Sequence, residues 1–217
     1  MRNRFDRQLL QLNDKLTQMG VMCEEAIALT VTALIEDNTE MAKGVYERDD
    51  EIDHLEREIE SLCLKMLLQQ QPVARDLRQI SAALKMITDL ERIGDQAADI
   101  AEIIIFLGGK SRMKFDEIKQ MASAVIKMVN SSIEAYVKRD CGLAKKVIKA
   151  DDEVDTLFIN IKEQIIKNIA AEGADGEFAI DMLMIAKYFE RIGDHAVNVA
   201  EWVEFSITGV HKGSPEM

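Results

Sequence analysis

The feature that most constrains the fold of this chain is an internal duplication. The segment ERIGDQAADIAE begins at Glu91, and the similar segment ERIGDHAVNVAE begins at Glu190. Earlier in each copy, VYERDDEID from Val45 resembles VIKADDEVD from Val147. The same segments therefore occur twice in the same order, which indicates two tandem copies of one folding unit. We place the first copy at residues 1–109 and the second at residues 110–217.

Each copy predicts three long amphipathic helices. In the first helix, apolar or small residues recur every three or four positions: Phe5, Leu9, Leu12, Leu16, Met19, Cys23, Ala26, Thr30 and Ala33. Asp37 and Asn38 break this pattern, Pro72 ends a second one, and Gly108 ends a third. Long helices joined by short turns fold back on one another as antiparallel bundles. We therefore predict an all-α protein with six long helices, arranged as two three-helix bundles related by pseudo-twofold symmetry.

The charge of the chain excludes several kinds of partner. Lys and Arg number 27 and Asp and Glu number 39, which gives a net charge of −12. Such a chain lacks the basic face that nucleic-acid binding requires. We find no uncharged apolar stretch of the roughly 20 residues that span a membrane, and the charged N-terminus does not resemble a signal peptide. We therefore expect a cytoplasmic protein that binds no nucleic acid.

The apolar residues of each predicted helix form a stripe along one face, which we call its seam. In the third helix of each copy, a glutamate interrupts this seam. Seven-residue steps from Leu77 reach Leu84 and then Glu91, and a step from Leu183 reaches Glu190. Small residues flank both glutamates, so another helix can approach closely. A charged side chain at a core position conflicts with simple packing, and such conflicts often mark functional sites.

Further carboxylates are expected at the same heights in the folded chain. If the chain turns at Pro72, Asp53 and Glu91 are each 19 residues from the turn, and Asp49 and Asp95 are each 23 residues from it. A turn near residue 173 brings the equivalent acids of the second copy level in the same way, because antiparallel helices rise equally per residue. The candidate site residues are Asp49, Asp53, Glu91, Asp95, Asp99, Asp151, Asp155, Glu190 and Asp194.

The residues alone leave two interpretations of these acids open. Two like charges about 8 Å apart repel by about 2 kcal/mol at an effective dielectric constant near 20, so a half-buried cluster needs compensation. Either it forms a solvated acidic face, neutralised by arginines such as Arg92 and Arg191, or it binds cations. Carboxylate ligands suit hard or borderline ions such as Mg, Mn and Fe, and also Zn.

A carboxylate-bridged di-metal protein of the ferritin type is the alternative function. It requires Glu-x-x-His pairs on two helices. Glu51 and His54 form one such pair, but the second copy has Glu153 and Thr156. The histidines do not follow the duplication, whereas the acids do. We therefore interpret His54 and His195 as solvated or capping residues.

The doubled ERIGD segment, the DDEID and DDEVD pair and the stretch from Gln71 to Asp95 resemble the PhoU family of phosphate-uptake regulators along nearly the whole chain. The resemblance implies two three-helix bundles with E(D)xxxD motif pairs that hold multinuclear metal clusters. These motifs match Asp49/Asp53 with Glu91/Asp95, and Asp151/Asp155 with Glu190/Asp194. The chain departs from the duplication at Asn198, which stands where the first copy has Asp99, so we expect the two clusters to differ.

The same resemblance implies a regulatory protein without catalytic activity. It implies an adaptor between the ATPase PstB of a phosphate ABC transporter and the sensor histidine kinase PhoR, which restrains the phosphate-starvation response when phosphate is plentiful. Such a protein meets the membrane only through its partners. The bound ions would be Fe, Zn, Mn or Mg, and no organic cofactor is implied. The long apolar seams also suit a homodimer, but three-helix bundles bury such seams internally, so the oligomeric state stays open.

Overall fold

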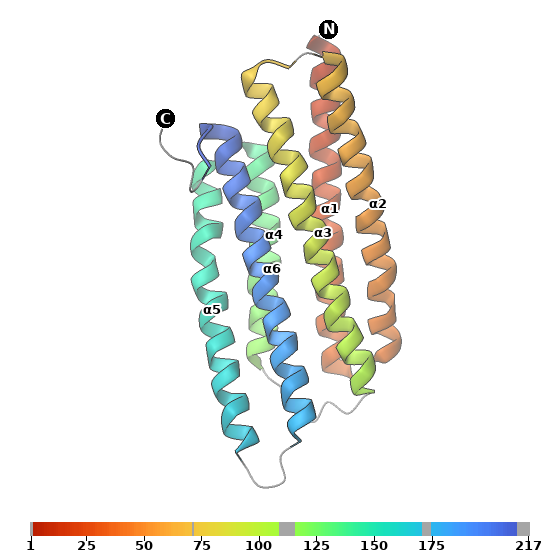
Figure 1. The fold of residues 1–217 in the computed structure, drawn as a ribbon, viewed down its shortest axis with the longest axis vertical. Coiled ribbons are helices and arrows are strands. Elements are labelled where there is room, and N and C mark those ends of the chain that lie inside the picture. The colour runs from red at the N-terminus through yellow and green to blue at the C-terminus, as the bar shows by residue number, and fades with distance from the viewer. Residues whose placement is uncertain (1, 71, 109–115, 171–174, 212–217) are drawn as a thin grey trace.

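The computed structural model describes residues 2–70, 72–108, 116–170 and 175–211, and this part of the chain consists of helices without a strand (Figure 1). The all-α prediction with six helices is confirmed. The helices are α1 (Arg2–Glu36), α2 (Thr39–Gln70), α3 (Ala74–Leu107), α4 (Asp116–Lys138), α5 (Cys141–Ile169) and α6 (Gly176–Thr208). The predicted boundary between the copies lies outside the described residues, because residues 109–115 are not among them.

In each copy, the turn between the first and second helices has the same conformation. Asp37 and Arg139, which are 102 residues apart, both adopt a positive φ, of 52° and 54°. The residue that follows each one caps the next helix: Asn38 Oδ1 accepts a hydrogen bond from the Met41 N–H at 3.0 Å, and Asp140 Oδ1 accepts one from Leu143 at 3.0 Å. A left-handed residue followed by a capping Asn or Asp ends one helix and starts the next within two residues.

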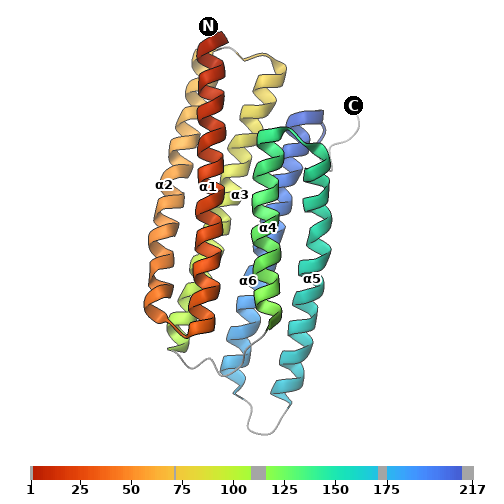
Figure 2. The same cartoon turned by 180° about the vertical axis from the view of Figure 1, so that it is seen from behind.

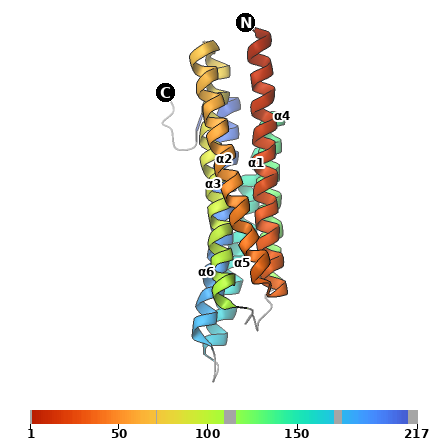
Figure 3. The same ribbon diagram turned by 90° about the vertical axis from the view of Figure 1, so that its right-hand side faces the viewer.

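The helices form two layers. One layer runs α2, α3, α6, α5, and α1 and α4 lie side by side behind it (Figures 1 and 2). A view along the edge separates the two layers (Figure 3). Within each copy all three helices contact one another, and the copies meet through α3 against α6 and α1 against α4. This pairing of equivalent helices is the pseudo-twofold arrangement that the duplication predicts.

The predicted seam of α1 lies in the core. Leu12, Leu16, Met19 and Cys23 are fully buried. On α3, in contrast, Leu77 is 45% exposed and Ile80 is buried, so the prediction that Leu77 belongs to the seam is wrong. An α-helix drifts by about 20° per seven residues relative to a strict heptad, and this drift carries the first turn of α3 off the seam.

Helix α1 is long enough and apolar enough to span a membrane, judged by length and composition alone. The segment Arg4–Glu36 contains an 18-residue window with a mean hydropathy of 1.4, of which 44% is buried in the protein. The window contains Glu24 and Glu25, so it is not the uncharged apolar stretch that the sequence analysis excluded. The buried residues of this helix pack against α2, α3 and α4, and a core helix of a bundle passes the same test.

Candidate functional site

The first carboxylate cluster lies between α2 and α3. Asp49 and Asp53 come from α2, and Glu91, Asp95 and Asp99 come from α3. Asp49 packs directly against Gly94, where an added Cβ would lie only 2.8 Å from Asp49 Oδ1. Asp95 and Asp99 act electrostatically on Asp49, and Asp53 acts on Glu91. The acids of α2 and of α3 therefore lie at the same level along the two helices, as expected.

The second cluster repeats this arrangement between α5 and α6. Asp151 packs against Gly193, whose Cβ, if present, would lie 3.1 Å from Asp151 Oδ1. Asp155, Asp194 and Glu190 all act electrostatically on Asp151. Asp155 and Asp194 are exposed, whereas all five acids of the first cluster are partly buried. The second cluster is therefore the better hydrated of the two.

Asp49 and Asp151 occupy the deepest position of each cluster. Burial, and then the neighbouring carboxylates, raise the pKa of each from 3.8 to about 6. One oxygen of each carboxyl, Oδ1, is buried without a hydrogen-bond partner among the described residues. A glycine leaves the space that each oxygen fills, because any larger residue would displace it. A buried acceptor without a donor is destabilising, which makes these two oxygens the best candidates for cation ligands.

The basic side chains that pair with the acids differ between the two clusters. Arg92 contacts two of the three cluster acids of α3, with its Nε 3.4 Å from Glu91 Oε2 and its Nη1 2.7 Å from Asp95 Oδ2. In the second cluster Lys187, which our sequence analysis did not single out, pairs with Glu190. Burial, and then Asp95 and Glu102, raise the pKa of Asp99 in the first copy. Arg191 of the second copy stacks on Tyr188, and its charge offsets part of that rise. Arg191, one of the two arginines expected to neutralise the acids, therefore acts on an acid of the first cluster.

The two clusters also differ in one neighbour that the sequence analysis missed. Glu56 lies beside the first cluster, where burial and the charge of Asp53 raise its pKa. The equivalent residue of the second copy is Phe158, and the Lys187 ammonium lies 5.5 Å from its ring centre. The three-residue spacing from Asp53 to Glu56 was the available signal. The first cluster therefore has an additional acid, and the second has a lysine of its own.

The carboxylates of the two clusters have the right chemistry for a bound cation, but they are not arranged around one position. No group of three or more His, Cys, Asp or Glu side chains is arranged to hold a metal ion within the ranges that the structure describes. The donor set is nevertheless of the right kind, because the two orphaned oxygens of Asp49 and Asp151 point to hard, oxygen-liganded ions. Glu91 and Glu190, the glutamates of the two clusters, are both partly exposed.

His54 and His195 directly follow the cluster acids Asp53 and Asp194, but each pairs with a carboxylate outside the clusters. His54 is exposed and pairs with Glu58 at 3.2 Å, in agreement with its interpretation as solvated. His195 is partly buried, and its Nδ1 lies 2.9 Å from Oδ1 of Asp89 on α3. Asn198 donates a hydrogen bond to the same oxygen at 3.0 Å. The interpretation of His195 as a solvated or capping residue is therefore wrong, because it joins the two copies. Neither histidine supports a ferritin-type site.

Comparison with known proteins gives the same two units. The family model described as "PhoU domain" matches residues 16–104 and 118–203. The chain belongs to the PhoU family. Each matched stretch contains one carboxylate cluster between its second and third helices.

Individual PhoU relatives match over almost their whole length. A protein of Clostridium acetobutylicum, named as a phosphate-specific transport system accessory protein PhoU homolog, is 37% identical over 207 residues, or 94% of each chain. PhoU homolog 1 of Thermotoga maritima is 34% identical, over 94% of this chain and 89% of its own. The crystal structure of PhoU from Pseudomonas aeruginosa superposes with a TM-score of 0.89 at 32% identity, covering 95% of this chain and all of that one.

Proposed function

We propose that this chain is a regulator of phosphate uptake that acts as an accessory protein of a phosphate-specific transport system and catalyses no reaction. The observation that carries the proposal is the match to accessory proteins of this name over 94% of the chain. It spans both copies and both carboxylate clusters, so the similarity is not confined to a single module.

The finer form of the proposal is a cytoplasmic adaptor. It contacts the transporter ATPase PstB and the sensor histidine kinase PhoR, and it restrains the phosphate-starvation response when phosphate is plentiful. Two features support this form: the two layers of long helices offer extended faces to two partners, and the strongly acidic surface suits protein partners better than phosphate backbones or anionic lipid.

Deletion of the gene in its own host tests this role. A phosphate-starvation reporter is expected to be active in phosphate-rich medium in the deletion strain and silent in the parent. A plasmid copy is expected to restore repression, because the regulator acts in trans. Co-purification of the tagged full-length chain with PstB and with PhoR tests the two contacts separately. An unchanged reporter in the deletion strain would contradict the proposal.

The second part of the proposal is that the carboxylate clusters bind divalent or iron ions, namely Fe, Zn, Mn or Mg. A bound ion would supply positive charge where Asp49 and Asp151 each have a buried oxygen without a donor. Lys187 already neutralises part of the second cluster, whereas Glu56 adds to the first. We therefore expect the cluster between α2 and α3 to bind its ions more tightly.

Metal analysis of two matched variants tests the sites. Glu91→Gln is expected to remove most of the bound metal, and Glu190→Gln to remove a smaller part, as measured by elemental analysis after purification without chelator. Glu58→Gln, which changes an exposed glutamate on the same helix as Asp49, is the control and is expected to retain the full metal content. Equal metal content in all three variants would exclude both clusters as the binding sites.

A further inference from the structure

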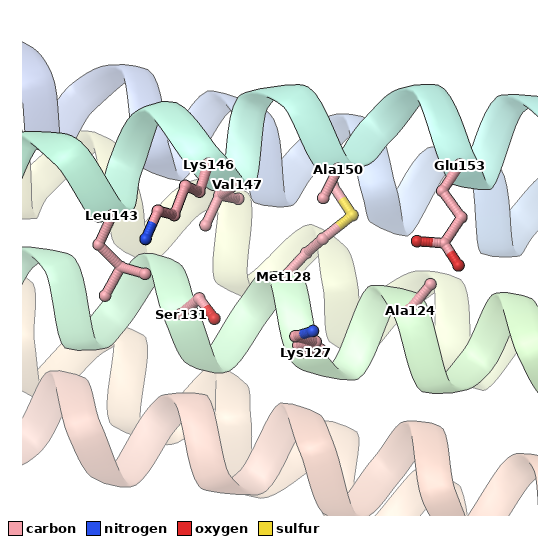
Figure 4. A pocket seen from close by; sticks show the side chains of 9 residues that line it. All are labelled: Ala124, Lys127, Met128, Ser131, Leu143, Lys146, Val147, Ala150 and Glu153. Carbon is pink, nitrogen blue, oxygen red and sulfur yellow. The ribbon is translucent and has the colours of Figure 1, made fainter.

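A pocket lies between α4 and α5, away from the carboxylate clusters. Its volume is about 200 Å³. Met128 and Val147, both 2% exposed, form its floor, and Leu143, Ala124 and Ala150 line its walls. Figure 4 shows the polar residues around the rim: Lys127 and Ser131 on α4, and Lys146 and Glu153 on α5.

The duplication provides an internal comparison for this pocket. Positions 102 residues apart are equivalent in these helices, because both the DDE segments and the two turn residues of positive φ have this separation. By this correspondence Ala124, Ser131 and Ala150 replace Met22, Leu29 and Arg48 of the first copy. Three large side chains have thus become small ones, and all three small residues line the pocket.

In the first copy, the larger residues make contacts across the same groove. Arg48 pairs with Glu25 of α1 at 3.4 Å and with Glu51 at 2.8 Å. Leu29 packs against Gly44, with its Cδ2 3.5 Å from where a Cβ would lie. The hollow between α1 and α2 is wide, and charged or polar groups line most of it: Arg48, Asp50, Glu51, His54, Glu58 and Gln18. The apolar pocket therefore arises from side chains that changed in the second copy.

The charge of the groove has changed as well. Lys127 stands where the first copy has Glu25, and Lys146 stands where it has Gly44. Neither ammonium group forms an ion pair with a carboxylate in the described part of the chain. Lys127 and Ser131 are four residues apart on one face of α4, and Lys146 reaches toward that face from α5 (Figure 4). In a chain of net charge −12, two lysines without acidic partners beside an apolar hollow point to an anionic ligand.

We propose that the pocket between α4 and α5 binds a small amphipathic anion, with its apolar chain on Met128 and Val147 and its anionic oxygens beside Lys127, Ser131 and Lys146. A partly open pocket of about 200 Å³ accommodates a short apolar chain, and the head group lies at the rim beside the polar residues. A carboxylate and a phosphate ester share the required chemistry. This site is independent of the carboxylate clusters and of the regulatory role proposed above.

Titration with hexanoate, observed at the methyl groups of Met128, Val147, Leu143 and Ala150 by NMR, tests the proposal on the full chain. Saturable shifts confined to these methyls are expected, with a dissociation constant on the order of 1 mM for a ligand of this size. Hexyl phosphate is the second arm, and the tighter of the two anions identifies the head group. Hexylammonium has the same chain and the opposite charge, and it is expected not to bind.

Variants that restore the residues of the first copy complete the test. Ala150→Arg is expected to weaken hexanoate binding at least about tenfold by filling the pocket, and Ala124→Met provides a second, uncharged filling. Changing Lys127 and Lys146 to Gln is expected to weaken binding about fivefold, as for two exposed ion pairs. Arg48→Ala in the first copy is the matched control and is expected to leave binding unchanged. Equal binding of hexylammonium, or full binding to both filled variants, would overturn the proposal.

Discussion

Replacement of Gly94 by Val is expected to lower the free energy of unfolding by about 2 to 3 kcal/mol. At Gly94, which lies on α3 in the first cluster, two side chains of α2 approach the backbone closely. A Cβ there would lie 2.8 Å from Asp49 Oδ1 and 3.1 Å from Ile52 Cδ1, both shorter than a normal contact. Ile52 is fully buried, so its side chain cannot move without disturbing the core, and the half-buried carboxyl of Asp49 would have to turn out of its place beside the glycine.

Urea unfolding followed by circular dichroism measures this effect. Gly44→Ala is the control, because the nearest atom to its Cβ would be Leu29 Cδ2 at an ordinary 3.5 Å. Gly44 lies inside α2, so the alanine is expected to stabilise the protein by up to about 1 kcal/mol through helix propensity. If Gly94→Val proved as stable as Gly44→Ala, the close approach of α2 and α3 described above would be incorrect.

Removal of the charges of Asp49 and Asp151 is expected to stabilise the metal-free protein at neutral and alkaline pH. In the folded state burial and the neighbouring acids raise both pKa values from 3.8 to about 6. A carboxyl with a raised pKa binds its proton more tightly in the folded protein. Its contribution to stability is therefore fully present below about pH 4 and is lost as the pH rises through about 6.

The size of the effect follows from the groups that face each carboxyl. Asp49 faces Asp95 and Asp99 on α3, and Asp50 and Asp53 on its own helix. Asp151 faces Glu190 and Asp194 on α6, and Asp152 and Asp155 on its own helix. Both carboxyls are only half-buried, and water screening reduces the penalty to about 1 kcal/mol each. The double variant Asp49→Asn, Asp151→Asn should therefore be about 2 kcal/mol more stable than the natural chain at pH 8.

Urea midpoints measured from pH 4.5 to pH 8 in the presence of chelator test this expectation. The natural chain should become less stable across this range, and the double variant should lose most of that dependence. The control variant Asp50→Asn, at an exposed position beside Asp49, should keep it. A natural chain whose stability rises from pH 5 to pH 8 without metal would show that the two carboxyls are not held in a strained, acid-rich environment.

The helices were predictable from the sequence because the signals that define them are local. Asp37 and Asn38 end α1 and start α2, and Gly108 caps α3 in a left-handed conformation. The main error in the seams was Leu77, and it arose because a strict seven-residue step was extended to the first turn of α3.

The candidate site was predictable in its acids but not in their surroundings. The level matching of Asp49 with Asp95, and of Asp151 with Asp194, follows from counting residues to a turn, since antiparallel helices rise equally. The three-residue spacing of Lys187 and Glu190 was an available signal for their pair, whereas the contact of Lys187 with the ring of Phe158 on α5 depends on tertiary packing. Whether the acids bind metal stays a prediction.

The sequence by itself determined that two copies of a three-helix unit exist and that the helices of the first copy break near Asp37, Pro72 and Gly108, because periodicity and turn residues act within a few positions of the chain. It also determined which acids lie at the same level along neighbouring helices. Only the tertiary structure decided that His195 and Asn198 share Asp89, that Arg191 serves the opposite copy, and that a pocket opens between α4 and α5. These contacts depend on the rotation of each helix about its axis and on side chains that are distant along the chain. Packing of the whole bundle fixes both.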